Sequence, residues 1–119
     1  MKIGFLFPGQ GSQATGMGKD IYDKYEVAKD VYDQVKKVTG IDVADITFNP
    51  PAEILNQTKY TQISILTMSL AILKVLEQHG IKAEASAGLS LGEYSALVYG
   101  NILSFEDGVS IVKNRGTYM

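Results

Sequence analysis

The chain has 119 residues, of which 45% are hydrophobic and 20% charged, and this balance excludes a disordered tail or a collagen-like chain. The net charge of −2 offers no basic excess for nucleic acid or for an anionic membrane, so we expect neither as a partner. The lack of cysteine excludes disulfides, thiolate zinc sites and a cysteine nucleophile, and a single histidine, His79, removes most other metal sites; we expect no metal and no cofactor.

The first forty residues predict a strand, a glycine-rich loop and a helical region. Residues 3–7 (IGFLF) form a short apolar run ended by a Pro-Gly pair, which is typical of a parallel-sheet strand covered on both faces. Residues 8–18 contain four glycines and are expected to form a loop. Asp20 is the expected N-cap of the helical region, which ends at Gly40, and the pattern leaves open whether it holds one helix or two. Its apolar face comprises Ile21, Tyr25, Ala28, Tyr32 and Val35.

The middle of the chain predicts one long helix. Residues 41–51 show no clear period, and the Asn-Pro-Pro sequence at 49–51 marks a turn. Residues 52–55 are predicted to form a single helical turn. A long, largely apolar helix follows over about 61–79, where a histidine near the negative end of the helix dipole and then Gly80 form a C-terminal signature.

No targeting or membrane-spanning segment is expected. The apolar run at 3–7 is too short for the core of a signal peptide. The longest uncharged helical stretch, at 60–73, is too short to cross a bilayer and contains several polar residues. We therefore expect a cytoplasmic protein.

The last forty residues predict a second strand and two helices. Residues 83–87 have poor strand propensity, but their place between a helix stop and a sharp glycine-rich turn favours a strand. A helical pattern resumes over 91–98 and stops near Gly100. Ser104, followed by Asp107, predicts the N-cap of a further helix. The order of elements predicts an α/β fold with a parallel sheet and a right-handed crossover.

Residues 88–92 (GLSLG) match G-x-S-x-G, the pattern of a nucleophilic serine on a tight strand-to-helix turn. Side chains at Gly88 and Gly92 would collide in such a turn, which lifts the hydroxyl of Ser90 above the sheet. The helix that follows presents free N–H groups to a developing oxyanion. Short patterns also occur by chance, so a second interpretation of Ser90, as a plain N-cap, stays open.

The glycine-rich loop after the first strand fits two roles. Gly9, Gly11 and Ala14 match the G-x-G-x-x-A fingerprint of dinucleotide-binding proteins, but two further glycines oppose the helix start that this fingerprint needs. The second role is electrostatic. Because parallel strands end at the same edge of a sheet, the backbone N–H groups of this loop lie near Ser90 and can supply an oxyanion donor.

Two further residues bear on catalysis. Arg115, judged alone, is typical of a solvated surface arginine, and Gly116 beside it indicates a helix end or a close approach to another element. His79 is excluded as the base for Ser90, because it lies at the opposite edge of the predicted sheet. Five or six strand residues at about 3.3 Å each separate the two by roughly 15–20 Å, against about 2.6–3.2 Å for a serine–base hydrogen bond.

Five blocks of sequence, in order and in spacing, resemble the malonyl-CoA:acyl carrier protein transacylases of type II fatty acid synthesis, to which the acyltransferase domains of polyketide synthases are related. The blocks are residues 7–13 (FPGQGSQ), 16–18 (GMG), 56–62 (NQTKYTQ), 87–97 (AGLSLGEYSAL) and 115–119 (RGTYM). Together they run through the whole chain and are far more specific than either glycine motif alone.

The resemblance implies a ping-pong acyl transfer. Ser90 would take the malonyl group from malonyl-CoA as an ester, and the pantetheine thiol of acyl carrier protein would then accept it. The resemblance assigns the oxyanion hole to the backbone N–H groups of Gln10 and Leu91. It assigns Arg115 to the malonyl carboxylate, a task that suits a bidentate guanidinium because it fixes a planar anion and excludes neutral acyl groups.

The resemblance also implies that residues 1–119 are the N-terminal part of an α/β-hydrolase-like acyltransferase domain. Family members are more than twice as long, and their ferredoxin-like subdomain and catalytic histidine have no counterpart here, so the chain alone is expected to be inactive. Leu89 stands where the family often has histidine, a change that can alter substrate contacts. Three alternatives stay open: a serine esterase of α/β-hydrolase type, a nucleotide-binding module and a non-catalytic fragment.

Overall fold

The computed structural model describes residues 2–49 and 52–118 of the chain. Within them the sheet has two parallel strands, β1 (Gly4–Phe7) and β2 (Ala85–Gly88). The register runs from Gly4 opposite Ala85 to Phe7 opposite Gly88. The predicted α/β class with a parallel sheet is therefore confirmed at this level, although most of the chain is helical.

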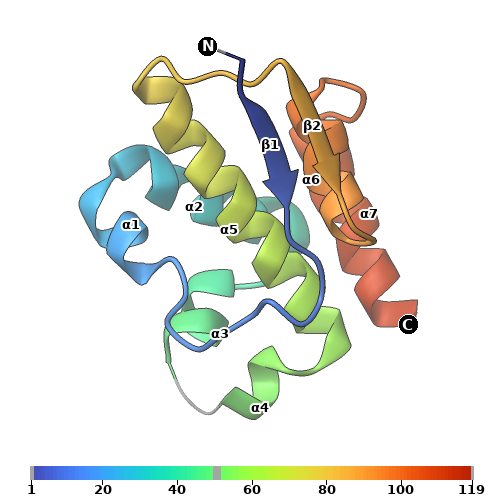
Figure 1. Ribbon diagram of the computed structural model, residues 1–119. Coiled ribbons are helices and arrows are strands. Elements are labelled where there is room, and N and C mark those ends of the chain that lie inside the picture. The colour runs from blue at the N-terminus through green and yellow to red at the C-terminus, as the bar shows by residue number, and fades with distance from the viewer. Residues whose placement is uncertain (1, 50–51, 119) are drawn as a thin grey trace.

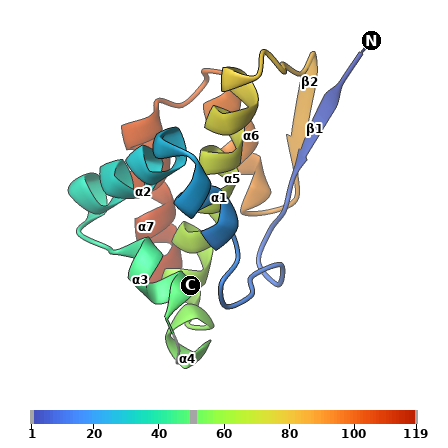
Figure 2. The same cartoon turned by 90° about the vertical axis from the view of Figure 1, so that its left-hand side faces the viewer.

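Both strands lie close to their predicted positions, and β2 runs one residue further than predicted. Its last residue is Gly88, the first glycine of the G-x-S-x-G pattern, because Gly88 still pairs with Phe7. The prediction that β1 is covered on both faces is wrong within this chain. Phe5 and Phe7 point into the core, but Leu6, on the opposite face, is 86% exposed because no described element covers it. Figure 2 shows the sheet at one side of the molecule, with the helices on the other.

The region after the glycine-rich loop contains two helices, α1 (Lys19–Lys24) and α2 (Glu26–Thr39). The break lies at Tyr25, whose backbone is extended. The prediction that Asp20 is the N-cap of this region is wrong. Gly18 is the N-cap of α1, with a φ of 78°, and the Asp20 carboxylate accepts from the N–H of Ile21 at 2.9 Å. Gly40 ends α2 with a φ of 77°, as predicted.

A short helix that was not predicted from the sequence, α3 (Val43–Phe48), lies within residues 41–51, which show no clear hydrophobic period. Its N-cap is Asp42, whose carboxylate accepts from the N–H of Asp45 at 3.1 Å. The helical turn predicted at 52–55 is present as α4 (Ala52–Leu55). The turn predicted at 49–51 falls partly on residues 50 and 51, which lie outside the described residues.

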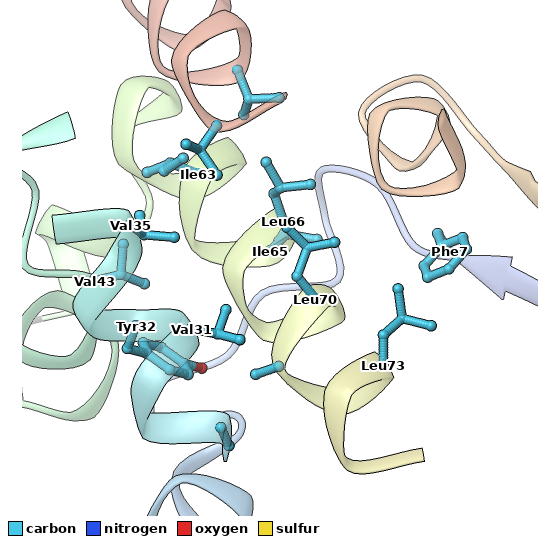
Figure 3. Packing of buried hydrophobic residues seen from close by; sticks show 14 of the residues in the cluster. Phe7, Val31, Tyr32, Val35, Val43, Ile63, Ile65, Leu66, Leu70 and Leu73 are labelled. Atoms are coloured by element: carbon cyan, nitrogen blue, oxygen red, sulfur yellow. The ribbon is translucent and has the colours of Figure 1, made fainter. Parts of the chain in front are cut away.

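The central element is α5 (Thr58–Gln78), which begins three residues earlier than predicted. Its first turn is secured by the hydroxyl of Thr61, which donates to the carbonyl oxygens of Leu55 and Gln57. Helices pack around it on several sides, and it contributes more buried apolar residues to the core than any other element does (Figures 1 and 3). The cluster drawn in Figure 3 includes Phe7, Val31, Tyr32, Val35, Val43, Ile63, Ile65, Leu66, Leu70 and Leu73.

The chain closes with α6 (Gly92–Tyr99) and α7 (Phe105–Tyr118). The Ser104 hydroxyl accepts from the N–H of Asp107 at 3.1 Å, which confirms the predicted N-cap. In Figure 1 both strand arrows point to the edge of the molecule where α5 begins and α7 ends, so four chain segments meet there. None of the described helices is both long and apolar enough to cross a membrane.

Candidate active site

Ser90 lies in the tight turn between β2 and α6, the strand–turn–helix context that a nucleophilic serine requires. Its φ is 52°, a conformation that non-glycine residues adopt at a cost of about 1–3 kcal/mol. Such strain persists only where the surrounding structure imposes it, and here the glycines on either side explain how. The turn places the serine at the carboxyl edge of the sheet.

Close backbone packing explains the three glycines around this turn. A Cβ on Gly88 would collide with the backbone of Gly92, and a Cβ on Gly92 would collide with the carbonyl of Phe7 at the end of β1. A Cβ on Gly9 would lie 2.6 Å from the carbonyl oxygen of Leu89. Side chains at these positions would therefore separate the serine turn from the loop that follows β1.

The two backbone donors expected to form an oxyanion hole lie on these adjoining loops. A Cβ on Gly9 would lie 3.9 Å from the backbone nitrogen of Leu91, and Gln10 is the residue that follows Gly9 in the chain. Among the described residues neither the N–H of Gln10 nor that of Leu91 has a hydrogen-bond acceptor. Two donors without an acceptor beside a candidate nucleophile are what an oxyanion hole needs.

Arg115 contacts the candidate nucleophile directly. Its Nη2 donates to Ser90 Oγ at 2.9 Å, and its Nη1 donates to Oε1 of Gln62 at 2.6 Å. The guanidinium carbon also lies 5.6 Å from the centroid of the Tyr94 ring, within range of a cation–π interaction. The interpretation of Arg115 as an ordinary solvated arginine is therefore wrong, because α7 returns its side chain to the serine turn.

Gly116 explains how α7 comes so near. A Cβ at this position would lie 2.9 Å from the Cα of Lys59 and 3.2 Å from the carbonyl oxygen of Thr58, so the last turn of α7 presses on the first turn of α5. Both alternatives raised by the sequence hold: Gly116 lies near a helix end, and it permits a close approach. This contact sets the distance between Arg115 and Gln62.

His79 lies at the other end of α5, as predicted. It is the C-cap of this helix, where its Nδ1 donates to the carbonyl of Val75 at 2.9 Å and its ring meets that of Tyr25 edge to face. Seventeen residues separate it from Gln62, which shares Arg115 with Ser90. At 1.5 Å per residue this places His79 about 25 Å along the helix from the site. His79 is excluded as the base for Ser90.

We predict that replacing His79 by alanine in the complete polypeptide leaves the reactivity of Ser90 unchanged. The variant should lose stability only, by about 1 kcal/mol in the free energy of unfolding, since one capping hydrogen bond and one ring contact disappear. Acylation measured by intact mass and unfolding measured in urea check the two parts. Loss of acylation in a folded variant would contradict the placement of His79.

Gln62, which the sequence did not single out, contacts two of the candidate site residues. It is fully buried on α5, and its two amide atoms contact Arg115 and Gln10. The signal in the sequence was a glutamine at the start of a long, largely apolar helix. A glutamine buried in such a helix needs specific hydrogen-bond partners, because buried amides are hydrogen-bonded. It lies within one of the five blocks that carry the family resemblance.

The other functional alternatives find less support in the geometry. The dinucleotide fingerprint needs a helix that starts inside the motif, whereas α1 begins at Lys19, five residues after Ala14. Within residues 2–49 and 52–118, no group of three or more His, Asp or Glu side chains is placed to hold a metal ion.

Comparisons with known proteins agree on one family. The acyl transferase domain family matches residues 4–119. The chain is 44% identical over 118 residues to the malonyl CoA-acyl carrier protein transacylase of Bacillus subtilis (strain 168), and the match covers 99% of this chain and 37% of that protein. These findings confirm the resemblance drawn from the five sequence blocks.

Solved structures agree with this match. The crystal structure of malonyl CoA-acyl carrier protein transacylase from Clostridium perfringens superposes with a TM-score of 0.94 at 48% identity, covering 100% of this chain and 38% of that one. A malonyl-transacylase in complex with a type II PKS acyl-carrier protein superposes with a TM-score of 0.93 at 36% identity, covering 98% and 38%. The chain thus spans less than two-fifths of the length of these relatives.

Proposed function

Because the chain belongs to the acyl transferase domain family, we propose that it carries the nucleophile and the acyl-selecting arginine of a malonyl-CoA:acyl carrier protein transacylase. The single observation that carries the proposal is the 2.9 Å hydrogen bond from Arg115 to Ser90 Oγ. It places a cation beside Ser90, which follows a strand and precedes a helix in a G-x-S-x-G turn. A plain esterase has no use for a guanidinium at that point.

In the proposed reaction Ser90 Oγ attacks the thioester carbonyl of malonyl-CoA. The C–S bond breaks, coenzyme A leaves as the thiol, and a malonyl ester remains on the serine. The carbonyl oxygen, negative in the tetrahedral intermediate, accepts from the N–H groups of Gln10 and Leu91. These donors stabilise the intermediate without moving, because both are fixed by the glycine contacts between the two loops. No cofactor takes part.

Arg115 selects the acyl group by its charge. The malonyl carboxylate takes the place of Ser90 Oγ as a partner of the guanidinium, which frees the hydroxyl to react. A charge-assisted hydrogen bond is roughly twice as strong as a neutral one, so a carboxylate displaces a hydroxyl. An acetyl group offers no such exchange. Acyl carrier protein then supplies the pantetheine thiol that cleaves the ester.

The proton of Ser90 requires a base that His79 cannot provide. We assign the base, a histidine by family resemblance, and the ferredoxin-like subdomain to the part of the relatives that lies beyond the matched 38%. On this proposal residues 1–119 are the N-terminal part of the α/β-hydrolase-like acyltransferase domain. The exposed face of β1 at Leu6 is then a surface on which further sheet or helix packs.

The test is to express the polypeptide from its complete reading frame, incubate it with malonyl-CoA, and locate the adduct by peptide mass spectrometry. We expect one malonyl group on the peptide that contains Ser90, and its transfer to holo acyl carrier protein. If the malonyl ester is hydrolysed at the same rate with and without the carrier protein, the result would support the esterase alternative instead. The absence of any adduct would overturn the proposal.

A further inference from the structure

We propose that Gln62 is a positioning residue that links the carboxylate-binding Arg115 to the loop that carries the oxyanion donor of Gln10. The inference rests on the proposed function, since it assigns a task to a residue that touches neither the nucleophile nor the acyl group. Gln62 lies in the second turn of α5, at the edge where the strands end.

The contacts form a chain across three elements. Gln62 Oε1 accepts from Arg115 Nη1 at 2.6 Å, and Gln62 Nε2 donates to Gln10 Oε1 at 3.2 Å. Gln10 Nε2 in turn lies 3.5 Å from Thr58 Oγ1, back on the first turn of α5. One buried amide thus touches the residue proposed to bind the carboxylate and the residue proposed to bind the oxyanion.

The guanidinium sets the direction of this chain. Arginine has donors and no acceptor, so Gln62 must turn its oxygen toward Arg115 and its NH₂ toward Gln10. Gln10 must then turn its oxygen toward Gln62 and its own NH₂ toward Thr58. A flip of the buried Gln62 amide would turn its NH₂ toward the donors of Arg115 and its oxygen toward the oxygen of Gln10, and unmatched polar groups on a buried side chain are costly.

Backbone packing makes the chain stiff. The first turn of α5 is held by the Thr61 hydroxyl, and the last turn of α7 is pressed against it at Gly116. Gln62 is fully buried, so its amide cannot exchange these partners for water. Its position therefore holds the guanidinium at one angle and the Gln10 side chain at one distance. Removing it releases both ends of the chain.

The two ends affect different substrates. The Arg115 end matters only for an acyl group with a carboxylate, such as malonyl. The Gln10 end matters for any acyl group, because every tetrahedral intermediate has an oxyanion. A residue that serves both ends lowers acetyl transfer when it is lost, and lowers malonyl transfer further.

The experiment measures kcat/KM for malonyl-CoA and acetyl-CoA in the polypeptide from its complete reading frame. We expect Gln62→Leu to lower the acetyl value about tenfold and the malonyl value about tenfold more, in line with the loss of one neutral and one charge-assisted hydrogen bond. In an Arg115→Ala background, Gln62→Leu should lower both values by the same factor, because the malonyl-specific end is already lost. Gln57→Leu is the control, an exposed glutamine five residues earlier whose side chain makes no capping bond; it should change neither value.

The outcomes separate the two proposals. A wild-type protein that forms no malonyl adduct overturns the proposed function, whatever the variants do. If the wild type is active and Gln62→Leu lowers kcat/KM for malonyl-CoA and acetyl-CoA by the same factor, the link to Arg115 is overturned. An unchanged acetyl value overturns the link to Gln10. Should Gln62→Leu fail to fold, Gln62→Glu is the variant to test, because it keeps the size of the side chain and the acceptor for Arg115. Its carboxylate competes with the malonyl carboxylate for the guanidinium, so KM for malonyl-CoA should rise while KM for acetyl-CoA does not.

Discussion

Replacing Ser90 by alanine should abolish malonyl transfer in the complete polypeptide. Loss of the serine nucleophile in hydrolases of the triad type costs about 10⁶ in kcat, and the same loss is expected here because no other hydroxyl lies in the G-x-S-x-G turn. The substitution leaves the backbone demand unchanged: alanine at a φ of 52° bears the same kind of strain as serine does. The variant should therefore fold, and its inactivity should report chemistry.

The measurement is the intact mass after incubation with malonyl-CoA. Ser95→Ala is the matched control, since Ser95 lies on α6, is buried, and its hydroxyl has no hydrogen-bond partner among the described residues. Its removal disturbs no bond, so the adduct should form as in the wild type. A malonyl adduct that persists on Ser90→Ala would refute the assignment of the nucleophile.

The second large effect is a change of acyl selectivity in Arg115→Ala. Loss of a charge-assisted hydrogen bond costs about 1.5–3 kcal/mol, which corresponds to a loss of roughly 10–150-fold in kcat/KM for malonyl-CoA. Acetyl-CoA, which has no carboxylate, should lose little, so the ratio of the two values shifts toward acetyl. Arg115→Lys should recover only part of the loss, because an ammonium group cannot hold Gln62 and a carboxylate in the same planar geometry.

Competition between the two acyl-CoA substrates, followed by mass spectrometry of the serine peptide, measures the ratio directly. Lys113→Ala is the control, a cation on the same helix that makes no ion pair among the described residues. It should leave the ratio unchanged. Equal losses for malonyl and acetyl in Arg115→Ala would mean that the arginine supports the fold around Ser90 and does not select the acyl group.

Local chemistry allowed several elements to be predicted from the sequence alone. Gly40 and the His79-Gly80 pair end their helices because only glycine adopts a positive φ without strain. The helix after Ser104 starts where the serine can cap it. These signals act over four or five residues, so the rest of the fold does not override them.

Other elements needed information that local sequence does not hold. The break at Tyr25 interrupts a continuous apolar face, so the pattern alone could not choose between one helix and two. Helix α3 was missed because six residues are too few to establish a period, although Asp42 and Asp45 in a capping arrangement are a usable signal. The exposure of Leu6 was mispredicted because an apolar run indicates only that both faces of a strand pack against other elements. It does not indicate whether those elements lie within residues 1–119.

By itself the sequence determined the strand–turn–helix context of Ser90, since only glycine at positions 88 and 92 tolerates such close backbone contacts. The sequence also excluded His79 as the base. Only the tertiary structure decided that Arg115, 25 residues further along, meets the serine hydroxyl, and that the buried Gln62 meets both Arg115 and Gln10. The physical reason is the range of the forces involved. Glycine requirements are local and sterically strict, whereas a hydrogen bond between distant residues exists only after α7 has packed against α5 at Gly116, and that packing depends on the whole core.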